Sequence, residues 1–132
     1  MEKIAYLSNE WVEELNNLAQ SHKGLKKATT GIELVVEYRV VDEETIVWQI
    51  NIDKDGIKIS VGCDHKPDVW FETDQSAAVS LFEGVLNPLT AVIEGTMEIG
   101  GDPRKLLEAS RMFEQFEDVF ETIRNRTVTN IQ

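Results

Sequence analysis

Cysteine and histidine are scarce in this chain of 132 residues, which has one cysteine, Cys63, and two histidines. A single cysteine cannot form a disulfide within the chain, and a metal site built from several thiolates is equally excluded. Because disulfides are typical of oxidising compartments, a chain that cannot form one fits a reducing compartment. We therefore expect a cytoplasmic location.

Basic residues are also in short supply. The chain has 13 Lys and Arg against 24 Asp and Glu, which gives a formal net charge of −11. Such a chain repels phosphate backbones, and it has no basic stripe of the kind that nucleic-acid-binding proteins carry. We expect no nucleic-acid partner and, for the same electrostatic reason, no stable membrane association.

Long apolar runs are absent as well. The longest run covers only residues 4–7, Ile-Ala-Tyr-Leu, whereas a membrane span needs about 20 apolar residues and the core of a signal peptide at least about 7. The last residues, Thr129 to Gln132, are not a peroxisomal Ser-Lys-Leu signal. At about 150 residues per domain, the length predicts a single domain over residues 1–132.

Capping residues and apolar residues at helical spacing predict four helices. The first begins after Ser8 and ends at Gly24, the second lies between Asp74 and Gly84, the third runs from Asn87-Pro88 to Gly95, and a long last helix begins at Asp102-Pro103 and frays into a polar tail.

Alternation of apolar and polar residues predicts five strands. They cover residues 32–40, 46–52, 57–61, 68–73 and 96–100, and the first three form an antiparallel meander. This order of elements predicts an α+β fold, with one curved, mostly antiparallel five-stranded sheet and helices packed on one face.

Two segments carry residue types used in catalysis or ligand binding. Cys63, Asp64 and His65 are consecutive, but adjacent loop residues rarely face one another as a catalytic dyad must, so a solvated loop is the better interpretation. Gly100 to Lys105 is a glycine-rich approach to a helix. It lacks the pattern of a phosphate-binding Walker loop, and a capped strand-to-helix turn is favoured over an anion site.

Tyr38 is the one polar residue on an apolar strand face with a claim to a pocket. A buried tyrosine that finds a backbone partner is still more common than a functional hydroxyl. The acidic residues of the last helix lie largely opposite its phenylalanines and are typical of a solvated face. We predict no catalytic residue, no metal site and no cofactor.

Three segments of the sequence resemble the type-two sterol carrier protein family. They are Pro67-Asp68-Val69-Trp70-Phe71-Glu72-Thr73-Asp74, Gly84-Val85-Leu86-Asn87-Pro88 and Gly95-Thr96-Met97-Glu98-Ile99-Gly100-Gly101-Asp102, with Ala91 between the last two. The resemblance implies a sheet covered by helices, with a hydrophobic tunnel between them that takes sterols, fatty acyl chains or acyl-CoA. It brings no catalytic residues.

The candidate ligand-binding residues are large apolar side chains on the inner faces of these elements: Trp48, Phe71, Phe82, Leu86, Ile93, Met97, Met112, Phe113, Phe116 and Phe120, with Tyr38 beside them. Each could equally belong to a dry core. Shape and apolarity suffice for a lipid, because burying a chain of about 16 carbons at ~0.8 kcal/mol per methylene releases on the order of 12 kcal/mol before association costs.

Three hypotheses about function remain open at this point. The leading one is a non-enzymatic lipid-binding or lipid-transfer domain for a fatty acid, sterol or acyl-CoA. The second is an interaction module, in which Phe116 and Phe120 on the last helix form a homodimer or dock an enzyme of lipid or quinone metabolism. The third is a small enzyme that uses Tyr38 or a carboxylate in an apolar cavity.

Overall fold

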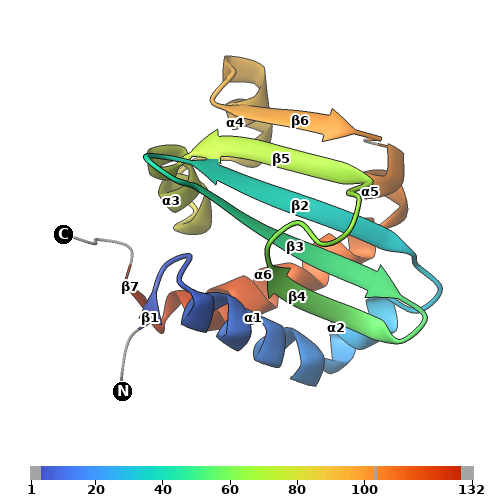
Figure 1. Ribbon diagram of the computed structural model, residues 1–132. Coiled ribbons are helices and arrows are strands. Elements are labelled where there is room, and N and C mark those ends of the chain that lie inside the picture. The colour runs from blue at the N-terminus through green and yellow to red at the C-terminus, as the bar shows by residue number, and fades with distance from the viewer. Residues whose placement is uncertain (1–3, 103, 129–132) are drawn as a thin grey trace.

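A five-stranded sheet forms the centre of the molecule in the computed structural model, which describes residues 4–102 and 104–128 (Figure 1). The strands are β2 (Leu34–Val41), β3 (Thr45–Asp53), β4 (Gly56–Val61), β5 (Val69–Asp74) and β6 (Met97–Gly101), in the order β4-β3-β2-β5-β6. β2 and β5 are parallel, and the other neighbours are antiparallel. The predicted mostly antiparallel five-stranded sheet is confirmed.

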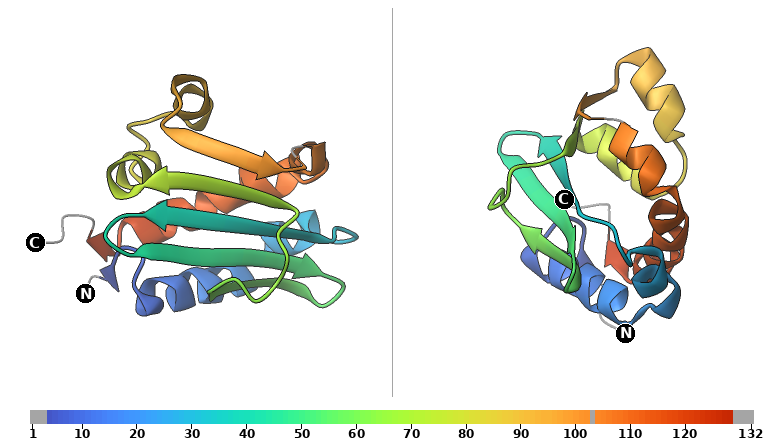
Figure 2. Two further views of the ribbon diagram at one scale, coloured as in Figure 1. Left: turned by 45° about the horizontal axis from the view of Figure 1, so that its top comes forward. Right: turned by 90° about the vertical axis from the view of Figure 1, so that its right-hand side faces the viewer.

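Helices gather on one face of this sheet (Figure 2). They are α1 (Asn9–Ser21), α2 (Lys23–Ala28), α3 (Gln75–Phe82), α4 (Pro88–Glu94), α5 (Arg104–Glu108) and α6 (Ser110–Arg124). The opposite, outer face is crossed by the segment that joins β4 to β5 (Figure 1). This crossing makes β5 parallel to β2, because it returns the chain to the end of the sheet where β2 begins.

Two helix boundaries differ from the prediction. The first helix breaks at His22, not at Gly24, because the His22 Nδ1 atom accepts a hydrogen bond from the Leu25 N–H (2.9 Å) and so caps α2. Gly24 lies inside α2, where a Cβ atom would collide with the Gln115 side chain of α6. The predicted long last helix is interrupted at Ala109 (φ −103°, ψ 17°), which separates α5 from α6.

The ends of the described chain form a small parallel pair that the sequence pattern did not predict. β1 (Ile4–Ala5) pairs with β7 (Thr127–Val128), where a frayed tail had been expected. Strands of two residues are too short to show alternation. The Ile4 N–H donates to the carbonyl oxygen of Arg126 (2.7 Å), which holds β1 beside the segment that follows α6.

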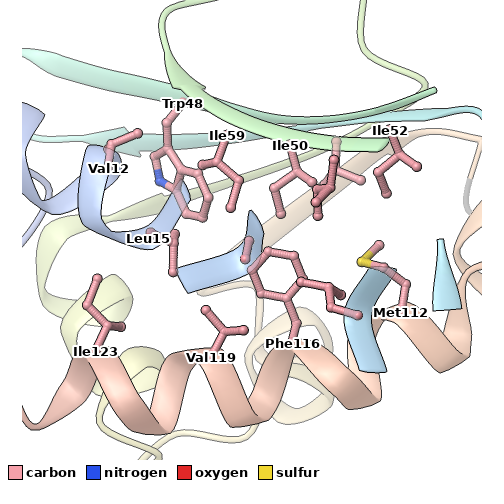
Figure 3. Packing of buried hydrophobic residues seen from close by; sticks show 14 of the residues in the cluster. Val12, Leu15, Trp48, Ile50, Ile52, Ile59, Met112, Phe116, Val119 and Ile123 are labelled. Atoms are coloured by element: carbon pink, nitrogen blue, oxygen red, sulfur yellow. The ribbon is translucent and has the colours of Figure 1, made fainter. Parts of the chain in front are cut away.

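The core lies between α6 and the sheet (Figure 3). Across four strands, Ile59, Ile50, Val36 and Val69 lie in register, and all four are buried. Phe116 of α6 points toward the sheet and is only 1% exposed. Each large apolar side chain buried in this way stabilises the fold by roughly 1.5–3 kcal/mol. The four strand residues Ile59, Ile50, Val36 and Val69 are called the aliphatic row below.

Candidate functional site: a cavity with aromatic walls

The next row along the strands is aromatic. Trp48 on β3, Tyr38 on β2 and Phe71 on β5 lie in register on the same face as the aliphatic row. Their rings stack, with centroids 4.3 Å apart for Tyr38 and Trp48 and 5.4 Å apart for Tyr38 and Phe71. The three residues are called the aromatic row below, and they form one wall of a cavity of about 270 Å³.

The opposite walls of the cavity come from the turn after β1, α1, α3 and α6. Tyr6 stacks on Phe82 of α3 with a centroid distance of 4.7 Å, and Trp11 of α1 meets Trp48 edge-on at 5.7 Å. Phe120 of α6 meets Phe82 edge-on at 6.2 Å. Among the described side chains, seven aromatic ones line the cavity: Tyr6, Trp11, Tyr38, Trp48, Phe71, Phe82 and Phe120.

A hydrogen-bond chain fixes the orientation of Trp11. The indole Nε1–H donates to Thr127 Oγ1 (3.1 Å), and the Thr127 hydroxyl donates to the carbonyl oxygen of Ile123 (2.6 Å). Both groups are buried. The short β1–β7 pair therefore contributes to the cavity, because it places Thr127 where the indole needs an acceptor.

Two charged side chains of α6 line the cavity on its solvent side. Arg124 donates from Nε to the carbonyl oxygen of Phe82 (2.7 Å), and its Nη2 lies 3.7 Å from a Glu117 carboxylate oxygen. The Glu117 side chain is 73% exposed, which marks this side of the cavity as the one nearest water. The interior is otherwise almost wholly apolar.

Both tyrosines of the cavity remain neutral over the physiological range. Burial raises the pKa of Tyr38 well above its ordinary value, and burial, together with the neighbouring Tyr38, raises the pKa of Tyr6. Loss of a proton would place a negative charge in an apolar space. These hydroxyls therefore serve as hydrogen-bond donors, and neither is activated as a base.

Five of the ten candidate ligand-binding residues come together at the cavity: Trp48, Phe71, Phe82, Met97 and Phe120. Tyr38, which was named beside the ten, lines the cavity as well. Met112 and Phe116 pack in the core beside the aliphatic row (Figure 3). Ile93 on α4 is 75% exposed, and Leu86 is half-buried outside the cavity lining. The Phe113 side chain lies outside the described part of the structure.

Sequence reasoning missed several wall residues, including Tyr6, Trp11, Leu81 and Arg124. A usable signal existed for three of them. Tyr6 belongs to the longest apolar run, Trp11 lies on the apolar face of the first helix, and Leu81 neighbours Phe82. Arg124 carried no such signal, because its place depends on where α6 ends.

The Cys63-Asp64-His65 segment lies on the outer face, away from the cavity. Gln49 holds it there, since the Gln49 amide donates to the carbonyl oxygen of His65 (2.7 Å) and accepts from the His65 N–H (3.2 Å). Cys63 is exposed. Within residues 4–102 and 104–128, no cluster of three or more His, Cys, Asp or Glu side chains is placed to hold a metal ion.

No helix in the described part of the chain is both long enough and apolar enough to cross a membrane.

Known proteins share both sequence features and the fold of this chain. A family model, the SCP-2 sterol transfer family, matches residues 13–114. A crystal structure of sterol carrier protein 2 shares 18% sequence identity and superposes with a TM-score of 0.69, over 87% of this chain and 96% of that one. A Thermus thermophilus protein, described as possibly a sterol carrier protein, shares 14% identity with a TM-score of 0.74, over 93% and 92% of the two chains.

A third structure, the ubiquinone synthesis protein UbiJ, shares 13% identity with a TM-score of 0.54, over 86% of this chain and 88% of that one. A search of curated proteins finds no match. At these identities the structures show a shared fold, and the family model covers most of the chain, including the three segments whose resemblance the sequence had indicated. The chain belongs to the SCP-2 sterol transfer family.

Proposed function

We propose that this protein binds one apolar small molecule in the cavity between the aromatic row and helices α3 and α6, and that it carries or presents this molecule without transforming it. The observation that carries the proposal is the cavity itself, about 270 Å³ in volume, with seven aromatic side chains in its lining. Membership of a sterol transfer family supports the same conclusion.

The size of the cavity favours a slim or flat ligand. Ligand pockets commonly measure about 300–1,000 Å³, so about 270 Å³ is at the lower end and suits a single acyl chain or a small ring system. Fatty acids, sterols and acyl-CoA remain the candidate classes, and the bulkier ones require the walls to move apart. Met97 in the wall is well suited to this, because an unbranched thioether adapts to irregular shapes.

The chemistry of the walls supports binding without catalysis. The described lining contains no histidine, cysteine, aspartate or lysine, and its one carboxylate, Glu117, lies beside Arg124. General acid–base catalysis needs a group whose pKa lies near the working pH. The raised pKa values of Tyr6 and Tyr38 move both hydroxyls away from that condition.

Native mass spectrometry of freshly purified protein tests the proposal. We expect additional mass of a few hundred daltons that is lost on organic extraction, and saturable uptake of a fluorescent fatty acid or sterol by the extracted protein. Leu81→Trp fills the cavity from α3 and should abolish uptake. Val85→Trp, four residues further on and 82% exposed, is the matched control and should retain it. Absence of both copurified lipid and uptake would overturn the proposal.

Three exposed apolar side chains favour a second candidate function. Val85, Ile93 and Leu107 lie on or beside α3, α4 and α5, and each is more than 70% exposed. A homodimer or a complex with an enzyme of lipid or quinone metabolism could bury them, and one protein with this fold is a ubiquinone synthesis protein. Phe116 is buried within one chain and is poorly placed for such a contact. A monomeric mass at every concentration, in light scattering, would argue against the dimer.

A further inference from the structure

The hydroxyl groups around the cavity differ in whether they have a hydrogen-bond partner within the protein. Thr73 donates to the carbonyl oxygen of Thr96 (3.0 Å), and Tyr6 donates to that of Ala78 (3.3 Å). The Tyr38 hydroxyl has no hydrogen-bond partner among residues 4–102 and 104–128, yet in the same residues no fully enclosed side-chain oxygen or nitrogen lacks one. The Tyr38 hydroxyl therefore retains accessible surface, and the cavity is the space that this residue borders.

The ring of Tyr38 is held in place by its neighbours. It is stacked between Trp48 and Phe71, at interplanar angles of 11° and 21°. A donor fixed in this way loses little conformational freedom when a ligand accepts its hydrogen bond. A ligand that covers the Tyr38 hydroxyl shields it from water, and a buried polar group without a partner is costly. A ligand with an oxygen at this point avoids that cost, whereas a wholly apolar ligand does not.

The two arginines of the cavity lining each have partners within the chain. Arg39 donates to the Glu37 carboxylate and lies over the Trp70 ring on the outer face, 4.4 Å from the centroid. Arg124 donates to the Phe82 carbonyl and faces Glu117. A ligand carboxylate would thus enter an apolar space and approach Glu117 at its solvent side, which costs desolvation and repulsion.

We propose that Tyr38 is the residue that determines specificity, by donating a hydrogen bond to a neutral oxygen, a carbonyl or a hydroxyl, of an otherwise apolar ligand, and that the cavity disfavours carboxylates. This inference rests on the proposed function, since it names the ligand class that the cavity takes. Among fatty acids, sterols and acyl-CoA, it favours a ligand whose buried part ends in a ketone or alcohol.

Three probes of nearly equal size separate these chemistries: 2-acetylnaphthalene, 2-ethylnaphthalene and 2-naphthoate. Their flat rings suit the stacked aromatic walls. Equilibrium dialysis against the extracted wild-type protein should show the ketone binding about 3- to 10-fold more tightly than the ethyl compound, the range that one net hydrogen bond provides. The carboxylate should bind most weakly.

Two conservative variants test the assignment to Tyr38. Tyr38→Phe should abolish the preference for the ketone, measured as the ratio of the two affinities within the variant, because the hydrogen bond to the ketone oxygen is lost. Tyr6→Phe is the matched control: its hydroxyl already donates to Ala78, so the preference should survive. Near-ultraviolet circular dichroism of each variant checks that the aromatic packing is retained.

The outcomes distinguish this inference from the proposed function. If none of the three probes binds the wild-type protein but the fluorescent lipid is taken up, the role of Tyr38 is overturned and the proposed function stands. If neither the probes nor the fluorescent lipid binds, both are overturned. If 2-ethylnaphthalene binds but the ketone is not preferred, if Tyr38→Phe keeps the preference, or if 2-naphthoate binds most tightly, the cavity is confirmed as a binding site and the role of Tyr38 is overturned.

Discussion

The aliphatic row and the aromatic row are neighbours on one face of one sheet, separated by two residues along each strand. Ile50 and Val36 in the first row are packed against the helices, whereas Trp48 and Tyr38 in the second border a cavity of about 270 Å³. The helix above shows the same change. Phe116 is buried in the core, and Phe120, one turn further along α6, lines the cavity.

The difference follows from the shapes of the side chains. Branched aliphatic side chains interdigitate from both layers and fill the space at the density of an organic crystal. Stacked rings instead support one another side by side, and a ring held between two others cannot rotate to fill the space above it. The same periodicity of apolar residues thus gives a packed core at one end of the sheet and a cavity at the other.

The largest expected effect in this comparison is on stability. Phe116→Ala removes a fully buried ring and should lower the free energy of unfolding by about 3–5 kcal/mol. Phe120→Ala should cost about half of that or less, because Phe120 is half-buried and already borders empty space. Urea titration of both variants measures the difference, and equal losses would mean that the two ends are packed alike.

Beside the aromatic row, the orientation of Trp11 depends on a buried hydrogen bond to Thr127. Thr127→Val leaves the buried Trp11 N–H without its acceptor and should lower the free energy of unfolding by about 1–3 kcal/mol. Thr127→Ser retains the hydroxyl and should cost clearly less. Thermal unfolding followed by near-ultraviolet circular dichroism provides the measurement, and equal losses for Val and Ser would show that Trp11 does not depend on the hydroxyl.

Alkaline pH should lower the free energy of unfolding through the two tyrosines that border the cavity. The pKa values of Tyr6 and Tyr38 are raised on folding, so their contribution to stability is complete below the unfolded value of about 10 and is lost as pH rises through the folded values. Each tyrosine should steepen the loss by at most about 1.4 kcal/mol per pH unit, because the unfolded chain releases a proton that the folded chain keeps.

Urea titrations at a series of alkaline pH values measure this slope. Tyr38→Phe and Tyr6→Phe should each make this slope shallower by at most the contribution of one proton, about 1.4 kcal/mol per pH unit. Lysines titrate in the same range, and comparing each variant with the wild-type protein cancels their contribution. An unchanged slope in both variants would show that the two hydroxyls are ionised as easily in the folded protein as in the unfolded one.

Much of the fold was readable because local signals agree with the tertiary structure. The strands of the meander alternate since one face contacts the helices, and Ser8 and Asp74 cap α1 and α3 as their sequence positions predict. The misplaced boundaries depend on distant contacts. His22 caps α2 through its own side chain and also meets Asp118 of α6 (3.3 Å), and Gly24 passes close to Gln115, so these boundaries depend in part on packing between α2 and α6.

The site was harder to predict than the fold. Phe116 and Phe120 belong to one apolar stripe at helical spacing, and periodicity gives the side of a helix but not whether the opposing surface is in contact. The aromatic row could be located from Tyr38, Trp48 and Phe71 on three strands. The apolar run marked Tyr6 as a buried residue, but its place at the cavity depends on the β1–β7 pair, and that of Arg124 depends on where α6 ends.

The smallest expected effect concerns Ile93, which the sequence placed among the ligand-binding residues and which is exposed on α4. Ile93→Ser should change the free energy of unfolding by no more than about 0.5 kcal/mol, as is usual for exposed positions, and should leave uptake of the fluorescent lipid unchanged. Met97→Ser is the matched comparison in the cavity wall and should lower both stability and uptake. Equal losses of uptake in the two variants would place α4 over the bound ligand, because only a movement of that helix could bring Ile93 to the cavity.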